Sequence, residues 1–177
     1  MKSINWLIFL LLFAVVLQSC GDNQRAKNYN DKTLVDDQGL AFIKTANIAG
    51  LTEITASRFA IDISKNPRVM AFAKMMVTDH TKVGKELSDL AKQKLVDIPD
   101  TLTMADQKKL SNMAMQYGAP YDRAYMKMMV DDHMKAVALF TDATQNKNSA
   151  VQNFANKTLP ALKMHLDSAK AIYNSLK

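Results

Sequence analysis

Residues 72–87 read FAKMMVTDHTKVGKEL, and residues 125–140 read YMKMMVDDHMKAVALF. The two stretches are 53 residues apart and identical at seven of sixteen positions, so Lys-Met-Met-Val-x-Asp-His-x-Lys occurs twice. The repeat places His80 and His133 at equivalent points of two similar segments. The third histidine of the chain, His165, lies in another segment with helical spacing of its apolar residues. We expect the three imidazoles to face one shared core, and an interior metal site is the hypothesis to test.

The whole domain is predicted to be helical, because apolar residues recur at steps of three and four and no strand-like alternation bounded by turns is found. The sequence predicts four long helices and one short one, over about 37–63, 67–96, 104–116, 120–144 and 149–177. Asp36 or Asp37 and then Asn66 supply caps, and Pro67 suits a first helical position. Pro160 falls inside the last helix, where it removes a hydrogen bond. The pattern describes an all-α four-helix bundle whose central crossover carries the short helix.

The N-terminus is predicted to be a lipoprotein signal peptide, residues 1–19. Lys2 precedes an apolar run over 4–17, which is too short for a convincing membrane span. Leu-Gln-Ser-Cys then ends at Cys20, the one cysteine of the chain, which we expect to be lipidated. The alternative is a secreted protein with a spare thiol. Residues 20–36 are polar and without period, so they are interpreted as a flexible tether to the bundle domain at 37–177.

These features predict a domain anchored to a membrane of the bacterial cell envelope, in the periplasm or at the cell surface. Gly21 and Asp22 do not decide between the inner and the outer membrane, and we favour the outer. The formal charge is +6, and removing the signal peptide takes away Lys2 and leaves +5. Because the basic side chains are interspersed and form no run, a nucleic-acid partner is not expected.

All three histidines fall on the apolar face of their predicted helices. A single histidine in such a row is usually a core residue that is hydrogen-bonded to a carbonyl or a carboxylate. The presence of all three histidines on inward faces is harder to explain in that way, because an inward stripe takes only about three of every seven helix positions. Burying several imidazoles without partners also costs stability, so something should coordinate or pair them.

The first long helix has no histidine but carries Glu53 in a row of small residues. Counted from the two hairpin turns, Glu53 and His80 lie about one helical turn apart in height, as do His133 and His165, and side-chain length can absorb this difference. Each long helix therefore offers one candidate ligand at similar depth, which is how metal sites are assembled in helical bundles. The sequence predicts these four residues as the ligands of one metal ion.

Asp79 and Asp132 each precede one of the repeated histidines. Because successive residues of a helix are about 100° apart, an aspartate and the next histidine cannot both point at the core. We interpret the aspartates as groups behind the site, where a carboxylate can orient an imidazole of a neighbouring helix. The alternative, a solvent-exposed face paired with lysine or arginine, stays open.

The identity of the metal is left open among zinc, iron, manganese and copper. The twelve methionines suggest copper, because thioethers and imidazoles suit Cu(I). Neighbouring pairs such as Met75 and Met76 spread over both sides of the stripe, however, and core packing is the preferred interpretation. No phosphate-binding glycine loop and no recognisable nucleophile motif occurs in the sequence, so binding is favoured over enzyme activity.

The segments FAKMMVTDH, YDRAYMKMMVDDH and TLPALKMH, together with Glu53, resemble a bacterial envelope family known as domain of unknown function 4142. The likeness covers about 37–175, and the family is sometimes described as an outer-membrane protein. The resemblance implies a ferritin-like bundle and no established activity. No Glu-x-x-His pair occurs in the chain, so it departs from the ferritin pattern and an iron-storage or ferroxidase role is not expected.

Two functional hypotheses follow from the sequence. The first is an envelope lipoprotein that binds a metal ion at an interior His/Glu site. The second is a non-catalytic structural or interaction lipoprotein whose histidines form a buried hydrogen-bond network with Glu53, Asp79 and Asp132. A metal site should lose stability when it is stripped by a chelator, whereas a hydrogen-bond network should not.

Overall fold

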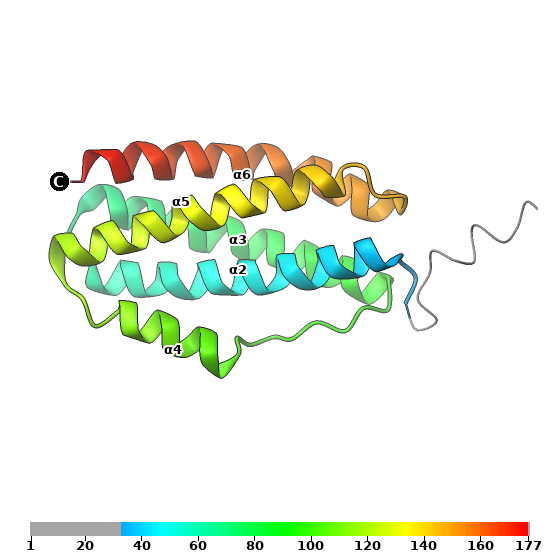
Figure 1. The fold of residues 1–177 in the computed structure, drawn as a ribbon, viewed down its shortest axis with the longest axis horizontal. Coiled ribbons are helices and arrows are strands. Elements are labelled where there is room, and N and C mark those ends of the chain that lie inside the picture. Colours follow the sequence, from blue (N-terminus) through cyan, green and yellow to red (C-terminus); the bar gives the residue numbers. More distant parts are fainter. Residues whose placement is uncertain (1–32, 177) are drawn as a thin grey trace, which may run out of the picture.

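The structure is a computed structural model that describes residues 33–176. Within these residues the chain forms five helices: α2 (Asp37–Ile63), α3 (Pro67–Gln93), α4 (Met104–Met113), α5 (Gly118–Ala143) and α6 (Ser149–Ser175). The four long helices lie side by side, and α4 lies in the crossover between α3 and α5 (Figure 1). No strand occurs in the described part, and the predicted all-α, ferritin-like bundle is confirmed. The predicted signal peptide and Cys20 lie outside the described residues.

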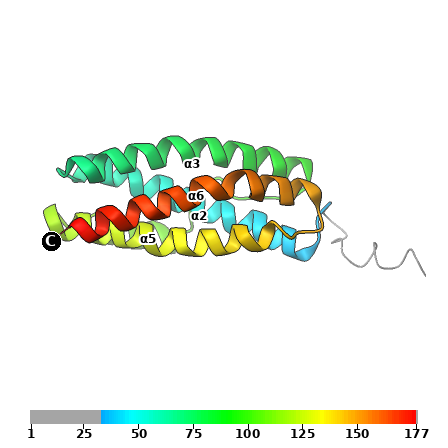
Figure 2. The ribbon, with the colours of Figure 1, turned by 90° about the horizontal axis from the view of Figure 1, so that it is seen from above.

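The topology explains the long crossover. α2 packs against α3 and α5, and α6 packs against the same two helices from the opposite corner. α3 and α5 run in the same direction, opposite to α2 and α6 (Figures 1 and 2). The chain must therefore return along the length of the bundle between α3 and α5, and the segment that carries α4 makes this return. One long crossover of this kind is characteristic of ferritin-like bundles.

Local chemistry sets where the helices begin. Four of them start behind a side chain that accepts hydrogen bonds from the first turn. The capping residues of α2, α3, α4 and α6 are Asp36, Asn66, Thr103 and Asn148. Pro67 occupies the first position of α3, where its missing N–H costs nothing. α5 has no side-chain cap and begins at Gly118, which has a φ of 62°.

α3 ends at Gln93, three residues before the end that the sequence predicts. Leu95 takes a φ of 56°, which closes the helix with a left-handed residue. The amide of Val96 then donates to the Ala91 carbonyl at 2.9 Å, and the amide of Leu95 to that of Lys92 at 3.2 Å. This pair of bonds is the Schellman motif, which usually has glycine at the left-handed position and therefore cannot be read from a leucine.

The bundle also begins earlier than the sequence indicates. The amide of Leu34 donates to the Lys94 carbonyl at 2.9 Å, and Val35 is fully buried. Asn148 donates a side-chain bond to the Leu34 carbonyl at 3.0 Å. The last residues of the predicted tether, from about 33, therefore pack across the end of the bundle, because Val35 supplies an apolar side chain to its core.

The described core consists of two hydrophobic clusters with a polar layer between them. One cluster, around Phe42, Phe140 and Phe154, fills the end near the α5–α6 turn. The other, around Phe72 and Tyr125, fills the end near the α2–α3 turn. Glu53 and the three histidines lie between these clusters along all four helices.

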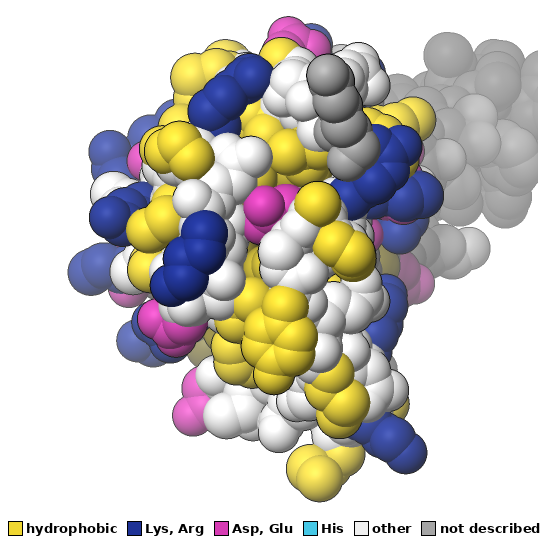
Figure 3. All heavy atoms as spheres, turned by 90° about the vertical axis from the view of Figure 1, so that its left-hand side faces the viewer, with side chains coloured by type: hydrophobic (Ala, Val, Ile, Leu, Met, Phe, Trp, Pro, Cys, Tyr) yellow, Lys and Arg dark blue, Asp and Glu magenta, His cyan; other side chains and the backbone are white. Residues whose placement is uncertain are grey.

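Figure 3 looks onto one end of the bundle, where hydrophobic side chains gather in the middle and Lys and Arg lie toward the edges. No histidine is visible on this face, since all three are buried. No described helix is long and apolar enough to cross a membrane.

Candidate metal site

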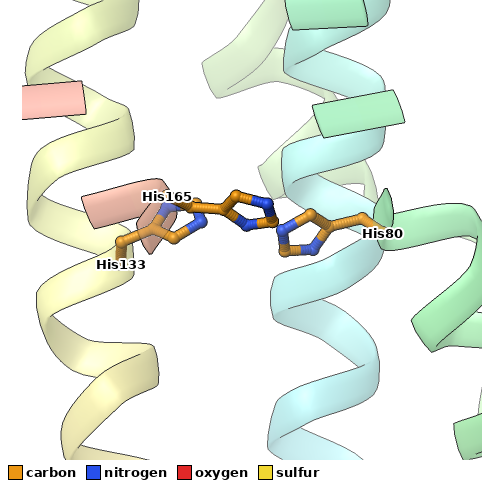
Figure 4. A group of neighbouring side chains, drawn as sticks. All are labelled: His80, His133 and His165. Carbon is orange, nitrogen blue, oxygen red and sulfur yellow. The ribbon is translucent and has the colours of Figure 1, made fainter. Parts of the chain in front are cut away.

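Each long helix contributes one buried side chain to the polar layer. Glu53 comes from α2, His80 from α3, His133 from α5 and His165 from α6, and none of them is more than 5% exposed. The centroids of the three imidazole rings are 5.5 Å apart in every pair. Figure 4 shows the rings converging between the helices. The structure therefore brings together the four residues that the sequence predicts as ligands.

One nitrogen of each ring is bound to another group of the protein. His80 Nδ1 lies 2.9 Å from Glu53 Oε2, and His165 Nε2 lies 3.0 Å from Asp79 Oδ2. His133 Nδ1 lies 2.9 Å from the carbonyl of Met129, one turn back on α5. Carbonyl and ionised carboxylate oxygens only accept hydrogen bonds. We therefore place the hydrogen of each neutral ring on the nitrogen that faces this partner.

The other nitrogen of each ring points away from these partners. His80 Nε2, His133 Nε2 and His165 Nδ1 are buried and have no hydrogen-bond partner among the described protein atoms. Each ring can offer one nitrogen to a common ion, and the three nitrogens so chosen all lie within 4.8 Å of one another. With the hydrogens on the outer nitrogens, three lone pairs meet in the middle of the bundle with no donor between them. Such an arrangement attracts a cation.

The three nitrogens are close to the spacing that a metal ion requires. Within a triangle of this size, one point lies at most about 2.8 Å from all three nitrogens. Zinc binds histidine nitrogen at about 2.0–2.1 Å, so each ring would have to move inward by less than about 1 Å. Small changes of the side-chain torsions can supply that shift. The residues present therefore fit a metal ion held by three imidazoles.

The electrostatics of the layer favour neutral His133 and His165 beside an ionised Glu53. Burial would raise the pKa of Glu53, but the hydrogen bond from His80 and the attraction of all three imidazoles outweigh it and lower this pKa. Burial lowers the pKa of His133 and of His165, against the attraction of the neighbouring carboxylates. Neutral imidazole is the form that binds metal, so burial favours the metal-binding form of His133 and His165.

The comparisons with known proteins agree with this fold. Residues 24–172 match the family described as Domain of unknown function (DUF4142). The chain belongs to the DUF4142 family. No curated protein matches it. Among solved structures it is similar to the crystal structure of a DUF305 fragment from Deinococcus radiodurans, with a TM-score of 0.70 and 11% identity over 79% of this chain and 97% of that one. That likeness shows a shared fold.

Glu53 of this DUF4142 domain is predicted from the sequence as a direct ligand, and that role stays a prediction. The structure shows that its carboxylate contacts two imidazoles. Oε2 contacts His80, and Oε1 lies 3.2 Å from His133 Nδ1. This second contact is an ion-pair distance without a hydrogen bond, because the His133 N–H is directed at the Met129 carbonyl.

The two aspartates of the repeat have different surroundings. Asp79 pairs with His165 across the α3–α6 contact, as expected for a carboxylate that orients an imidazole of another helix. Asp132 pairs instead with Lys135 on its own helix, at 3.2 Å, with 77% of the lysine side chain exposed. The structure thus places only one of the two aspartates in hydrogen-bond contact with an imidazole.

Sequence reasoning did not single out the Met129 carbonyl. Its signal is the four-residue spacing to His133, which lets an imidazole bond to the carbonyl one turn back. Tyr121 and Tyr125, which carry part of the family resemblance, lie in the cluster around Phe72 beside the site. Tyr125 shares a 2.8 Å hydrogen bond with Ser57, which ties α5 to α2.

Proposed function

We propose that this DUF4142 domain binds one transition-metal ion through His80 Nε2, His133 Nε2 and His165 Nδ1. One observation carries the proposal: each imidazole is fixed by the protein on one nitrogen and leaves the other without a partner, toward the other two rings. Metal-binding histidines usually have this arrangement, with a carboxylate or carbonyl behind the ring. Three nitrogen donors suit zinc, copper or iron better than manganese, which prefers oxygen.

The competing function is a structural hydrogen-bond network without metal. A closed network would give both nitrogens of every ring a partner, since unpartnered buried polar atoms cost stability. Here three ring nitrogens in one layer lack a partner among the described protein atoms. The geometry therefore favours metal binding. Three protein ligands leave a coordination position open, which would let the ion take part in sensing, buffering or redox protection.

We also propose that Cys20 carries a lipid that holds the domain at the bacterial cell envelope, with the outer membrane favoured. The support is the apolar run over 4–17, which is followed after Gln18 and Ser19 by the one cysteine of the chain. Replacing Cys20 by Ser should move the protein from the membrane fraction to the soluble fraction. Retention of the variant in the membrane fraction would contradict the anchor.

Metal uptake tests the main proposal. Protein purified without a histidine tag should bind about one zinc or copper ion per chain in a calorimetric titration. A chelator should lower the melting temperature of the loaded protein, because an ion present at about a hundred times its dissociation constant stabilises by about 2.7 kcal/mol. His133→Ala should bind none. Met134→Ala, which changes a half-exposed neighbour, is the matched control.

Two results would contradict metal binding at this site. One is that the wild-type protein takes up no metal ion, and the other is that His133→Ala binds the ion as well as Met134→Ala does. A protein that binds no metal and whose melting temperature is indifferent to chelator would support the hydrogen-bond network instead.

A further inference from the structure

Two exposed leucines lie at the end of the bundle where the described chain begins. Leu34 is 50% exposed and Leu95 is 62% exposed. The amide of Leu34 donates to the carbonyl of Lys94 at 2.9 Å, so the backbones that carry the two side chains meet at one hydrogen bond. The α5–α6 turn lies at this same end, and the C-terminus lies at the opposite end (Figure 1). We refer to Leu34 and Leu95 as the leucine pair.

The fold requires neither of the two side chains. Leu34 makes its contacts through backbone atoms, since its amide bonds to Lys94 and its carbonyl accepts from Asn148 at 3.0 Å. The neighbouring Val35, and not Leu34, fills the core. Leu95 holds a φ of 56°, a conformation that suits glycine and is strained for a residue with a Cβ. Strain that is kept at an exposed apolar residue points to a role outside the packing of the bundle.

The leucine pair also lies at the end of the domain nearest in sequence to Cys20. Thirteen residue steps lead from Cys20 to Thr33, the first described residue, and they span at most about 45 Å. The long helix α2, with 27 residues, is itself about 40 Å long. With Cys20 held at a bilayer, the end that carries the leucine pair is therefore tied closer to the lipid than the opposite end. A short tether gives a local concentration on the order of millimolar, at which a contact that is weak on its own can form.

The charges around the leucine pair are of both signs. Among the described residues within three positions of either leucine, the exposed charged ones are Lys92, Asp37 and Asp97. This balance favours neither an anionic nor a cationic partner. The surface that suits exposed leucines among mixed charges is the interface of a zwitterionic bilayer, where leucine side chains enter the boundary between head groups and acyl chains.

We propose that the leucine pair inserts into the surface of the bilayer that holds Cys20, so that the bundle stands with this end on the membrane. This orientation depends on the lipid anchor on Cys20 proposed above. The opposite end, where Tyr117 precedes α5 and is 76% exposed, faces away from the lipid. The histidine layer lies between the two ends and is held above the membrane surface.

Quenching of a single tryptophan by brominated lipid tests this orientation. Trp6→Phe removes the one tryptophan of the chain, and the full chain is purified from cells and reconstituted in phosphatidylcholine vesicles. With Leu95→Trp added, the emission should shift to shorter wavelength, and bromine on the acyl chains should quench it. Tyr117→Trp is the matched control, because the opposite end also has hydrophobic side chains on its surface (Figure 3), and it should show neither effect. Leu34→Trp replaces Leu95→Trp if that variant does not fold.

Mass spectrometry of the same samples separates the orientation from the anchor on which it depends. If Cys20 carries no lipid, the anchor is refuted and the orientation with it. If Cys20 is lipidated but Leu95→Trp is quenched no more than Tyr117→Trp, the anchor stands and insertion of the leucine pair is refuted. Stronger quenching of Tyr117→Trp would show that the membrane contacts the opposite end.

A polar replacement within the leucine pair provides a second test. Leu34→Ser in the Leu95→Trp protein should reduce the quenching, because the pair then loses one of its two apolar side chains. Met134→Ser, which changes a side chain of similar exposure (54%) on α5, should leave the quenching unchanged. Equal quenching in these two variants would refute insertion of the pair.

Discussion

The three carboxylates beside the histidines should differ sharply in their effect on metal affinity. Glu53 faces two imidazoles, at 2.9 Å and 3.2 Å, and is 2% exposed. Glu53→Gln keeps one oxygen that can accept from His80 but turns an NH₂ group toward the N–H of His133, and it removes the buried negative charge. Losing a carboxylate behind a metal-bound histidine costs about 10- to 100-fold in affinity. Because two rings are affected, we expect about 100-fold, or about 2.7 kcal/mol.

Asp79 and Asp132 complete the comparison. Asp79 supports one ring, and 39% of its side chain is exposed, so water can replace part of the bond. Asp79→Asn should therefore cost no more than about tenfold. Asp132 pairs with an exposed lysine, so Asp132→Asn should change the affinity by less than about twofold.

The assay is competition for zinc against a chromophoric chelator at neutral pH, with circular dichroism to show that each variant is folded. The expected order of loss is Glu53→Gln, then Asp79→Asn, then Asp132→Asn. If Asp132→Asn lowered the zinc affinity as much as Glu53→Gln, the reasoning would be refuted, because the contacts of the two carboxylates with the imidazoles would then not determine their effect on affinity. An unchanged affinity in Glu53→Gln would also refute it.

Three further results are expected. Burial lowers the pKa of His133 and His165, so below their ordinary value of 6.5 the unfolded chain binds more protons than the folded protein. Urea unfolding of the metal-free protein should therefore show a free energy of unfolding that is constant above about pH 6.5 and falls below it. A further loss is expected below pH 4.5, because the folded pKa of Glu53 is lowered and the unfolded chain takes up this proton first. A free energy of unfolding that stays constant down to pH 4 would contradict this. Leu95→Gly should raise the free energy of unfolding by about 1 kcal/mol, because an exposed leucine holds a φ of 56° there, and a loss of stability would show that the left-handed turn costs nothing. Gly84→Ala should add about 0.5–1 kcal/mol in the same measurement, since its Cβ meets open space, and destabilisation would mean that the space is filled.

The sequence predicts the fold well because the helix signals are local. Asp36, Asn66 and Pro67 mark helix starts, and the spacing of apolar residues selects the inward face without knowledge of the other helices. The ends are less predictable, since α3 stops at a leucine with positive φ, which no propensity indicates. The match to the DUF4142 family adds no chemistry.

The site was only partly predictable for a related reason. The periodicity indicates that His80, His133 and His165 face the core, and counting from the turns places the candidates of each hairpin within about one helical turn in height. Neither feature of the sequence shows which oxygen atom accepts a hydrogen bond from which imidazole. Asp79 and Asp132 have the same sequence context but different neighbours, because α3 packs against α6 at Asp79, whereas the carboxylate of Asp132 pairs with a lysine on its own helix.

A cavity of about 640 Å³ between α2, α3 and the crossover that carries α4 could not be predicted from the sequence. Gly50 and Gly84 are isolated glycines in helical segments, and the space between them depends on how far α2, α3 and the crossover stand apart. That distance is a property of the packed bundle.

The most direct test of the central claim is the X-ray absorption spectrum of the zinc-loaded protein. We expect three imidazole nitrogens at about 2.0–2.1 Å from the zinc ion, with one further light ligand. The spectrum of His133→Ala should lose this pattern. Bound zinc without three imidazoles in its first coordination sphere, or a spectrum unchanged in His133→Ala, would contradict a metal site built from His80, His133 and His165.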